Sequence, residues 1–530
     1  MTTATLQRND RLVETLQDIL GKDQVITDQA EREFFSADVY TAGKTVAAIV
    51  RPKDKAGIGK AVAAASRAGY AVVGRGGGMS YTKGYPQNRE DSICIDVGAL
   101  NRIVEVNEND MYITVEAGVT WKQIYDALKP KGLRLPFFGT FSGMRATVGG
   151  GLSQGALFMG TARYGQAADI VLGIEVIAAD GSVIRTGQGA FRNAKPFYRT
   201  YGPDLTGLFL HDGGAFGIKV QASFKLIKMP AASGFASFVF PGGAAGAVAA
   251  LSDIARSGAA EDAYVFDPES TDKNLASPDI VQDMKTLAGV VTGQSSWMKG
   301  LIEGTKLVLA GRSFAKEGMH SVHCVCAGRS EAAVEADLEI IRKIAARHKG
   351  EEIPNSIPKA VRADPFKPLN GVIGANGDRW AALNAKVPHS QAPALIAACE
   401  AVLTRYKPQM DALKISVSRL NIAIDTHSYS YEPVLHWYDS WLPVHSRIPE
   451  PSYLAKIKDP GPNPKATALV EEIRTELCKV FADFGASSNQ IGKTYPYWDN
   501  LDGNTQKLLK AIKQHVDPDG QFNPGVLGLK

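Results

Sequence analysis

The first hundred positions switch between the helical and the strand repeat of apolar residues. Residues 5–21 carry Leu, Val and Ile at helical spacing, which predicts a helix. A short apolar strand over 47–50 and an alanine-rich helix over 55–68 follow, and then a second strand. This order predicts a β-α-β unit. The unit ends at three consecutive glycines, Gly76, Gly77 and Gly78.

Further along the chain, the same patterns predict a strand-rich region and then alternating helices and strands. Strands are expected over 91–97, 102–106, 111–116, 170–178 and 223–227, with a helix over 121–128. After a change in composition near Ser233, helices are expected over 244–257, 332–347, 391–405 and 465–484. Strands are expected there over 235–240, 319–327, 379–385 and 413–424.

Length and composition indicate a globular protein of two or more domains. The chain has 530 residues, of which 45% are hydrophobic and 22% charged. The formal net charge of +4 gives no reason to expect nucleic acid or an anionic membrane as a partner. We find no apolar stretch long enough to span a bilayer and no secretory signal, so a cytoplasmic location is the default expectation.

The cysteines do not form a recognisable framework. There are five, an odd number, and no CxxC pair is present. We expect buried, reduced thiols at all of these positions. They are Cys94, Cys324, Cys326, Cys399 and Cys478.

The triple glycine is the first candidate for chemistry. Glycines bury no side chain, so such a run lets the backbone approach a ligand closely or adopt positive φ. The freed N–H groups suit phosphate oxygens, although a simple glycine-rich hairpin loop explains these residues about equally well. A Rossmann fingerprint is disfavoured because no helix opens after Gly76 and no acidic residue stands in the right place about 20 positions on. An NAD site is therefore not expected.

A second glycine cluster over 146–151 and the sequence Tyr164-Gly165 extend the pattern. Taken in order, these motifs resemble the flavin-binding module of the vanillyl-alcohol oxidase / p-cresol methylhydroxylase superfamily, which includes D-lactate and glycolate dehydrogenases. The last residues, 522–525, resemble the superfamily's terminal FNPG signature. The resemblance implies an α+β fold with a two-subdomain FAD-binding domain. That domain would comprise residues 1–230 and 485–530, with an inserted α/β cap over 231–484.

The same resemblance implies which residues hold the cofactor. The flavin is expected to be bound without a covalent bond, because Met79 stands where bicovalent relatives have histidine, and 377–380 offers neither His nor Tyr. The expected FAD-binding residues are Arg75, Gly76, Gly77, Gly78, Met79, Ser80, Gly84, Tyr85, Thr140, Thr147, Gly150, Gly151, Tyr164, Gly165, Gly217, Ile218 and Asn523.

A flavin enzyme must also supply a group that takes the proton of the substrate hydroxyl. Candidate groups are densest between Arg419 and Arg447, where strand alternation places Tyr429 and Tyr431 on one face with His427. The alternative is a half-buried strand whose aromatic residues are core. The other members of this group are Glu432, His436, Tyr438 and His445.

A second group lies near the C-terminus. In the resemblance, Lys493 stands close to the position at which the phenol-oxidising relatives carry an arginine that stabilises a phenolate. Tyr495 follows it in the sequence. Lys493 could hold a substrate anion as a point charge, or it could be a surface lysine in a turn. Residues 488–490 read Ser-Asn-Gln where the metal-dependent relatives carry Glu-His-Gly, so no metal site is expected.

The resemblance favours an FAD-dependent oxidoreductase that dehydrogenates a CH–OH group of a small organic hydroxy acid or alcohol. Oxidation of para-substituted phenols or aromatic alcohols is the alternative within this class. A non-catalytic flavoprotein and an alkyl-glycerone-phosphate-synthase-like transferase are weaker alternatives. The expected partners are a small-molecule substrate and an electron acceptor, either oxygen or a redox partner, and assembly into a homo-oligomer is left open.

Overall fold

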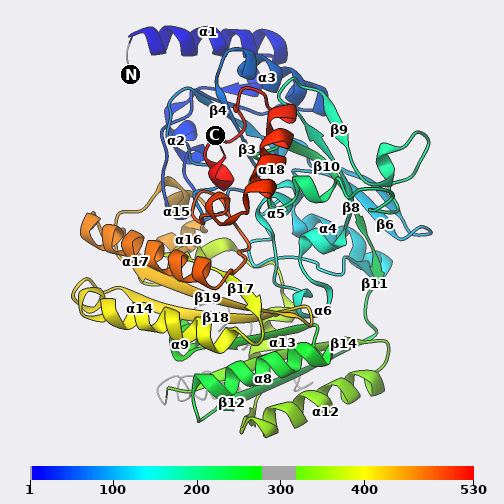
Figure 1. Cartoon of the computed structure of the whole chain (residues 1–530), viewed down its shortest axis with the longest axis vertical. Coiled ribbons are helices and arrows are strands. Elements are labelled where there is room, and N and C mark those ends of the chain that lie inside the picture. Colours follow the sequence, from blue (N-terminus) through cyan, green and yellow to red (C-terminus); the bar gives the residue numbers. More distant parts are fainter. Residues whose placement is uncertain (1–2, 277–317, 530) are drawn as a thin grey trace.

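The predicted N-terminal β-α-β unit forms a four-stranded sheet in the computed structural model, which describes residues 3–276 and 318–529. The strand order is β1-β2-β4-β3, and β4 runs parallel to both β2 and β3. Helices α1 and α3 bury leucine, isoleucine and valine side chains against one face (Figure 1). The elements are α1 (Thr3–Leu20), β1 (Val25–Ile26), α2 (Gln29–Phe35), β2 (Ala48–Val50), α3 (Lys55–Arg67), β3 (Ala71–Arg75) and β4 (Ser92–Asp96).

A five-stranded antiparallel sheet follows, with the order β5-β6-β10-β8-β9. A capping box between Thr120 and Gln123 starts helix α4, and β7 pairs with β11 at one side. The elements are β5 (Ile103–Asn107), β6 (Tyr112–Glu116), α4 (Trp121–Leu128), β7 (Leu133–Arg134), α5 (Val148–Gln154), α6 (Thr161–Tyr164), α7 (Ala167–Ile170), β8 (Val171–Ile177), β9 (Val183–Arg185), β10 (Ile218–Lys225) and β11 (Ile227–Lys228).

The third layer is a large antiparallel sheet that we call the cap sheet. Its order is β15-β12-β14-β13-β18-β19-β16, and β17 also pairs with β19. Helices α8, α12, α14 and α17 pack on one face, and the other face turns toward the two smaller sheets (Figure 1). The strands are β12 (Ala232–Phe240), β13 (Asp262–Phe266), β14 (His320–Gly328), β15 (Glu351–Ile353), β16 (Arg379–Ala382), β17 (Ala385–Pro388), β18 (Ser416–Ile424) and β19 (Ser428–Trp437).

The helices of this region match the apolar pattern closely. Helix α8 has the predicted bounds, whereas α14 continues past Pro408 because its buried face extends to Met410. The helices are α8 (Ala244–Ser257), α9 (Pro268–Ala276), α12 (Glu331–Arg347), α13 (Ser356–Ala363), α14 (Ala392–Ala412), α15 (Pro443–Arg447), α16 (Pro451–Leu454) and α17 (Pro464–Asp483).

The five cysteines are buried, unpaired thiols, as the sequence predicts. Among the described helices, none has the length and apolarity needed to cross a bilayer.

The C-terminal segment returns to the first sheet through α18 (Gly503–Val516). A buried lysine fixes it there: the Lys513 ammonium donates to the carbonyl oxygens of Ala215 (2.7 Å) and Phe522 (3.0 Å) and to the Asp517 carboxylate (2.6 Å). Asp517 in turn accepts from the Phe522 N–H at 2.7 Å. The Lys513 ammonium therefore joins the end of the chain to the loop before β10 through its hydrogen bond to Ala215, while its ion pair with Asp517 lies within the C-terminal segment.

Replacing this lysine should destabilise the fold. Lys513→Met leaves the buried Asp517 carboxylate without its counter-charge, and breaking a buried pair in this way costs about 3–5 kcal/mol. Thermal unfolding of the two proteins should show a clearly lower melting temperature for the variant. Lys510→Met, at an exposed position of the same helix, is the control and should leave the melting temperature unchanged. Equal melting temperatures for Lys513→Met and wild type would contradict this role.

Candidate functional site

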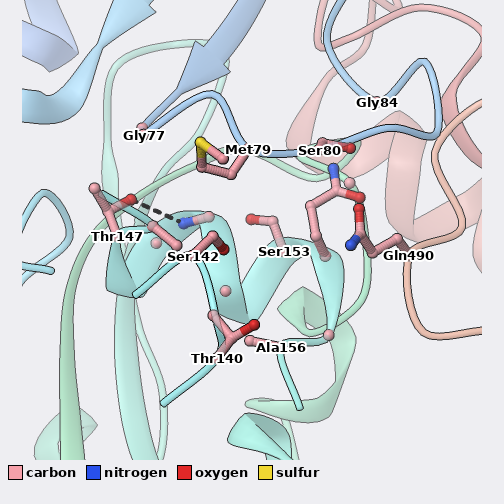
Figure 2. A pocket seen from close by; sticks show the side chains of 18 of the residues that line it. Gly77, Met79, Ser80, Gly84, Thr140, Ser142, Thr147, Ser153, Ala156 and Gln490 are labelled. Atoms are coloured by element: carbon pink, nitrogen blue, oxygen red, sulfur yellow. Dashed lines mark hydrogen bonds between the residues drawn. The ribbon is translucent and has the colours of Figure 1, made fainter. Parts of the chain in front are cut away.

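An elongated cavity runs between the two smaller sheets and ends against the cap sheet. Its walls are the loop after β3, the start of α5, the loop before β10 and strands β18 and β19. Figure 2 shows Gly77, Met79, Ser80 and Gly84 along one edge, with Thr140, Ser142 and Ser153 across the space from them. The cavity thus brings together both glycine clusters and the cap.

The triple glycine is required by close packing. A side chain at Gly76 would collide with the Thr147 side chain, and one at Gly77 with the Arg145 carbonyl. Gly78 has φ 71° and its Cβ position is filled by the Arg75 guanidinium. Contacts within the protein thus require glycine at all three positions.

The second glycine cluster forms the facing wall. Thr147 caps α5 by accepting from the Gly150 N–H at 3.4 Å (dashed in Figure 2). Side chains at Gly149 and Gly151 would clash with Ala117 and Trp121 respectively. Backbone N–H groups and the Ser153 hydroxyl therefore face the triple glycine across a narrow gap, a donor set that suits a pyrophosphate.

Most of the expected cofactor residues line this cavity. They are Arg75, Gly76, Gly77, Gly78, Met79, Ser80, Gly84, Tyr85, Thr140, Thr147, Gly150, Gly151, Gly217 and Ile218. Together they fit a long ligand with an anionic centre, and FAD has that shape and charge.

Three expected cofactor residues lie outside the cavity wall. Tyr164 packs beside Arg134, and Gly165 packs against Asp169. Asn523 acts behind the wall: its Nδ2 donates to the carbonyl oxygens of Gly84 and Gly213, both at 2.6 Å. It therefore positions two cavity loops without lining the cavity.

The cap strands β18 and β19 line the cavity with one face, and it is not the face of Tyr429 and Tyr431 that the sequence predicted. Leu420 and Ile422 of β18 and Glu432 of β19 line the cavity. Tyr429 instead donates to Asn421 at 2.9 Å and Tyr431 to Glu400 at 2.9 Å, on the helix-covered face. The alternation was correct, but these tyrosines belong to the core.

The remaining predicted catalytic groups also do not line the cavity. Arg419 pairs with Glu400 (2.5 Å) and Asp267 (3.2 Å), and His427 is exposed in the turn before β19. The ammonium of Lys493 donates to the Pro86 carbonyl at 2.8 Å. Tyr495 accepts from the Asn384 N–H at 2.7 Å and stacks on Phe481. These are structural contacts.

Glu432 is the titratable group that the structure places at the cap end. It faces the cavity, and desolvation by the surrounding protein raises the pKa of its carboxyl to about 7. The Asn384 Nδ2 lies 3.3 Å from the carboxylate and is itself held by Ser430 at 2.6 Å. Tyr81 also lines the cavity, and burial and the nearby Glu432 raise the pKa of its hydroxyl well above 10, so it stays protonated.

Two amides complete the cap end. Asn489 and Gln490 line the cavity, and Gln490 is seen at its edge in Figure 2. The Asn489 carbonyl lies 3.2 Å from Nδ1 of His211, whose pKa burial lowers to about 4. In the part of the chain that the structure describes, no group of three or more His, Cys, Asp or Glu could hold a metal ion.

Sequence reasoning passed over these groups for identifiable reasons. Glu432 stood among the candidates but carried no motif that distinguished it from its neighbours. Tyr81 belongs to the loop after the triple glycine, but its position in the sequence did not indicate a role in the chemistry. His211 has no local signal at all, because only the fold brings it to Asn489.

Comparisons with known proteins agree with this geometry. A family profile described as an FAD binding domain matches residues 46–187. The chain is 28% identical over 233 residues to the mitochondrial D-lactate dehydrogenase [cytochrome] of Arabidopsis thaliana, covering 43% of this chain and 39% of that protein. It is also 28% identical over 219 residues to the glycolate oxidase subunit GlcD of Bacillus subtilis (strain 168), covering 41% and 45%. Each match spans less than half of the relative.

Among solved structures, p-cresol methylhydroxylase with substrate bound superposes with a TM-score of 0.73 at 17% identity, covering 100% of this chain and 98% of that one. The fold is therefore a mixed α+β fold that matches p-cresol methylhydroxylase over the full length, as predicted. Within it, residues 46–187 match an FAD binding domain, and the similarity in sequence to the D-lactate dehydrogenase and the glycolate oxidase subunit covers less than half of the chain.

A side chain at Gly77 should abolish FAD retention. Gly77→Val places a branched side chain against the Arg145 carbonyl, so the loop must move out of the gap that it shares with α5. The purified variant should show less than about a tenth of the wild-type FAD-to-protein absorbance ratio, since the cradle loses its donor geometry.

Gly503→Ala, where nothing lies within 4 Å of the added Cβ, is the matched control and should retain full FAD. Circular dichroism will separate lost binding from lost folding. A folded Gly77→Val protein with full FAD occupancy would rule out the cradle.

Proposed function

We propose that the chain binds FAD non-covalently and dehydrogenates a CH–OH group of a small organic hydroxy acid or alcohol. The observation that carries this proposal is Glu432, a carboxyl with a pKa of about 7 at the cap end of the cavity. A general base works best when its pKa lies near the working pH. A protein that only stored flavin would not need such a group there.

Each wall of the cavity has a role in this reaction. The two glycine segments would hold the pyrophosphate, and bound FAD would supply the hydride acceptor. Glu432 takes the proton of the substrate hydroxyl, Asn384 orients the carboxylate, and Tyr81 donates a hydrogen bond to the substrate. Leu420 and Ile422 exclude water from the reacting end. No step uses a metal ligand.

Oxidation of phenols or aromatic alcohols is the second candidate. Phe141 and Phe158 line the cavity with ring centroids 3.9 Å apart and could pack against an aromatic substrate. The transferase alternative gains no support from His427, which lies in an exposed turn. The electron acceptor, oxygen or a redox partner, and the oligomeric state are left as predictions.

Removing the charge of Glu432 should stop the chemistry while leaving FAD bound. Glu432→Gln keeps the size of the side chain but cannot accept the proton, and loss of a general base costs about 10²–10⁴-fold in rate. Anaerobic stopped-flow bleaching of the flavin by 2-hydroxy acids, neutral alcohols and phenolic alcohols measures this step. Glu472→Gln, exposed on α17, is the control and should react like wild type.

The pH dependence of the same step identifies the group. Because the raised pKa keeps the carboxyl protonated below about 7, the rate of flavin reduction should rise with pH through this value. In Glu432→Gln the residual rate should show no such rise. Wild-type bleaching that is independent of pH from 5 to 9 would remove Glu432 as the base. Bleaching that is lost on chelation and restored by a divalent cation would replace the metal-free mechanism.

The attachment of the flavin is tested separately. Met79 cannot form a bond to the flavin, and the cavity wall formed by the described residues contains no His or Cys. Acid precipitation of the yellow protein should therefore leave the flavin in the supernatant. A washed pellet that stays fluorescent would show a covalent bond, with Tyr81 and Tyr85 as the wall residues to examine first.

A further inference from the structure

A second, open cleft of about 810 Å³ lies on the other side of the triple glycine. It shares Arg75, Gly76, Gly77 and Thr147 with the cavity, so these residues form a common wall. Its other sides come from different elements: α2, the start of α4, and Arg447 at the end of α15. The cleft therefore adjoins the space proposed for FAD, while Phe34, Arg145 and Arg447 line the cleft and not the cavity.

Three guanidinium groups gather around one phenyl ring in this cleft. The Cζ atoms of Arg75, Arg145 and Arg447 lie 4.9, 5.6 and 4.3 Å from the centre of Phe34. They come from β3, from the segment before α5 and from α15. Arg75 and Arg145 thus come from residues 1–230, and Arg447 comes from the predicted cap over 231–484.

The charges in the cleft do not balance. Its walls hold five cationic side chains, Arg51, Arg75, Lys122, Arg145 and Arg447, and three carboxylates, Glu31, Asp96 and Asp126. Each carboxylate is already paired, Asp96 with Arg51 at 2.6 Å, Asp126 with Lys122 at 2.5 Å, and Glu31 with Arg447. Two positive charges, those of Arg75 and Arg145, are left over.

Arg75 is also enclosed, and Arg145 is partly so. Arg75 is 2% exposed, and none of its three guanidinium nitrogens has a hydrogen-bond partner among the described residues. Arg145 donates from Nε to the Gly77 carbonyl at 2.7 Å. Burial and the positive charge of Arg75 lower the pKa of Arg145. Desolvated, uncompensated charge is costly, so an anion placed here would be stabilised strongly.

We propose that this cleft binds a phosphate group of a small molecule, with Arg75, Arg145 and Arg447 as its ligands. A phosphate carries about −1.5 to −2 charges at neutral pH, which matches the two unpaired cations. Its three terminal oxygens can accept from several guanidinium groups at once, whereas one arginine already satisfies a carboxylate. The ligand would bridge the flavin domain and α15 of the cap.

Isothermal titration of the FAD-loaded protein with inorganic phosphate, at constant ionic strength, tests the site. Loading with FAD fills the cavity first, so phosphate cannot take the place of the cofactor. Wild type should show saturable binding to one site. Arg145→Gln should bind at least about tenfold more weakly, because one charge-assisted contact is lost, and Arg145→Lys should retain part of the affinity.

Arg447→Gln provides an independent variant outside the FAD cavity and should also bind more weakly. Arg405→Gln, at an exposed position on α14, is the matched control and should bind as wild type does. No saturable binding by the FAD-loaded protein would overturn the proposal. Binding seen only in FAD-free protein would place phosphate at the cofactor site and overturn it too. Equal affinity in wild type, Arg145→Gln and Arg447→Gln would show an adventitious ion only.

Discussion

The close approach of two backbone segments sets the geometry on which the rest of the site depends. Residues 76–78 and 147–151 lie so near each other and their neighbours that a side chain at most of these positions would collide with something. The first segment follows β3 of the four-stranded sheet. The second forms the start of α5, which contacts β10 of the five-stranded sheet. Because protein interiors are close-packed, neither sheet can shift without changing the width of the gap. The cofactor site is thus fixed by the contact between two subdomains.

Local signals in the sequence predicted the parts of this structure that local physics determines. The triple glycine, helix α8 and the β-α-β unit each depend on residues close together in the chain, so their patterns were sufficient. The cap strands predicted over 235–240, 319–327 and 413–424 were also located, but β13 and β15 were missed and the stretch 379–385 is divided between β16 and β17. The functional face of the cap strands was not located, because both faces of β18 and β19 carry apolar and polar residues, and period two cannot say which face meets the cavity. Tyr429 and Tyr431 therefore looked catalytic although they are core, while Glu432 did not stand out.

Contacts between distant segments were beyond the reach of sequence reasoning. Lys493 was matched to a functional position by its spacing, but the fold carries its ammonium to the Pro86 carbonyl. The cluster of arginines around Phe34 comes from three segments separated by tens to hundreds of residues, and no composition or spacing signal joins them. Charges in this protein are organised by tertiary structure: buried lysines such as Lys219 meet a specific carboxylate, Asp212 at 2.5 Å, whereas the arginines at the cleft do not.

The bridge made by Asn523 has a consequence for the order of events in biosynthesis. Its amide joins the loop at Gly84 to the loop at Gly213, and a third bond, from Gln87 at 2.8 Å, fixes the orientation of that amide. The ribosome makes both loops hundreds of residues before it makes the asparagine that ties them together. These contacts can therefore form only after residue 523 has been made, so the two loops acquire their shared anchor later than any contact that they make with earlier residues.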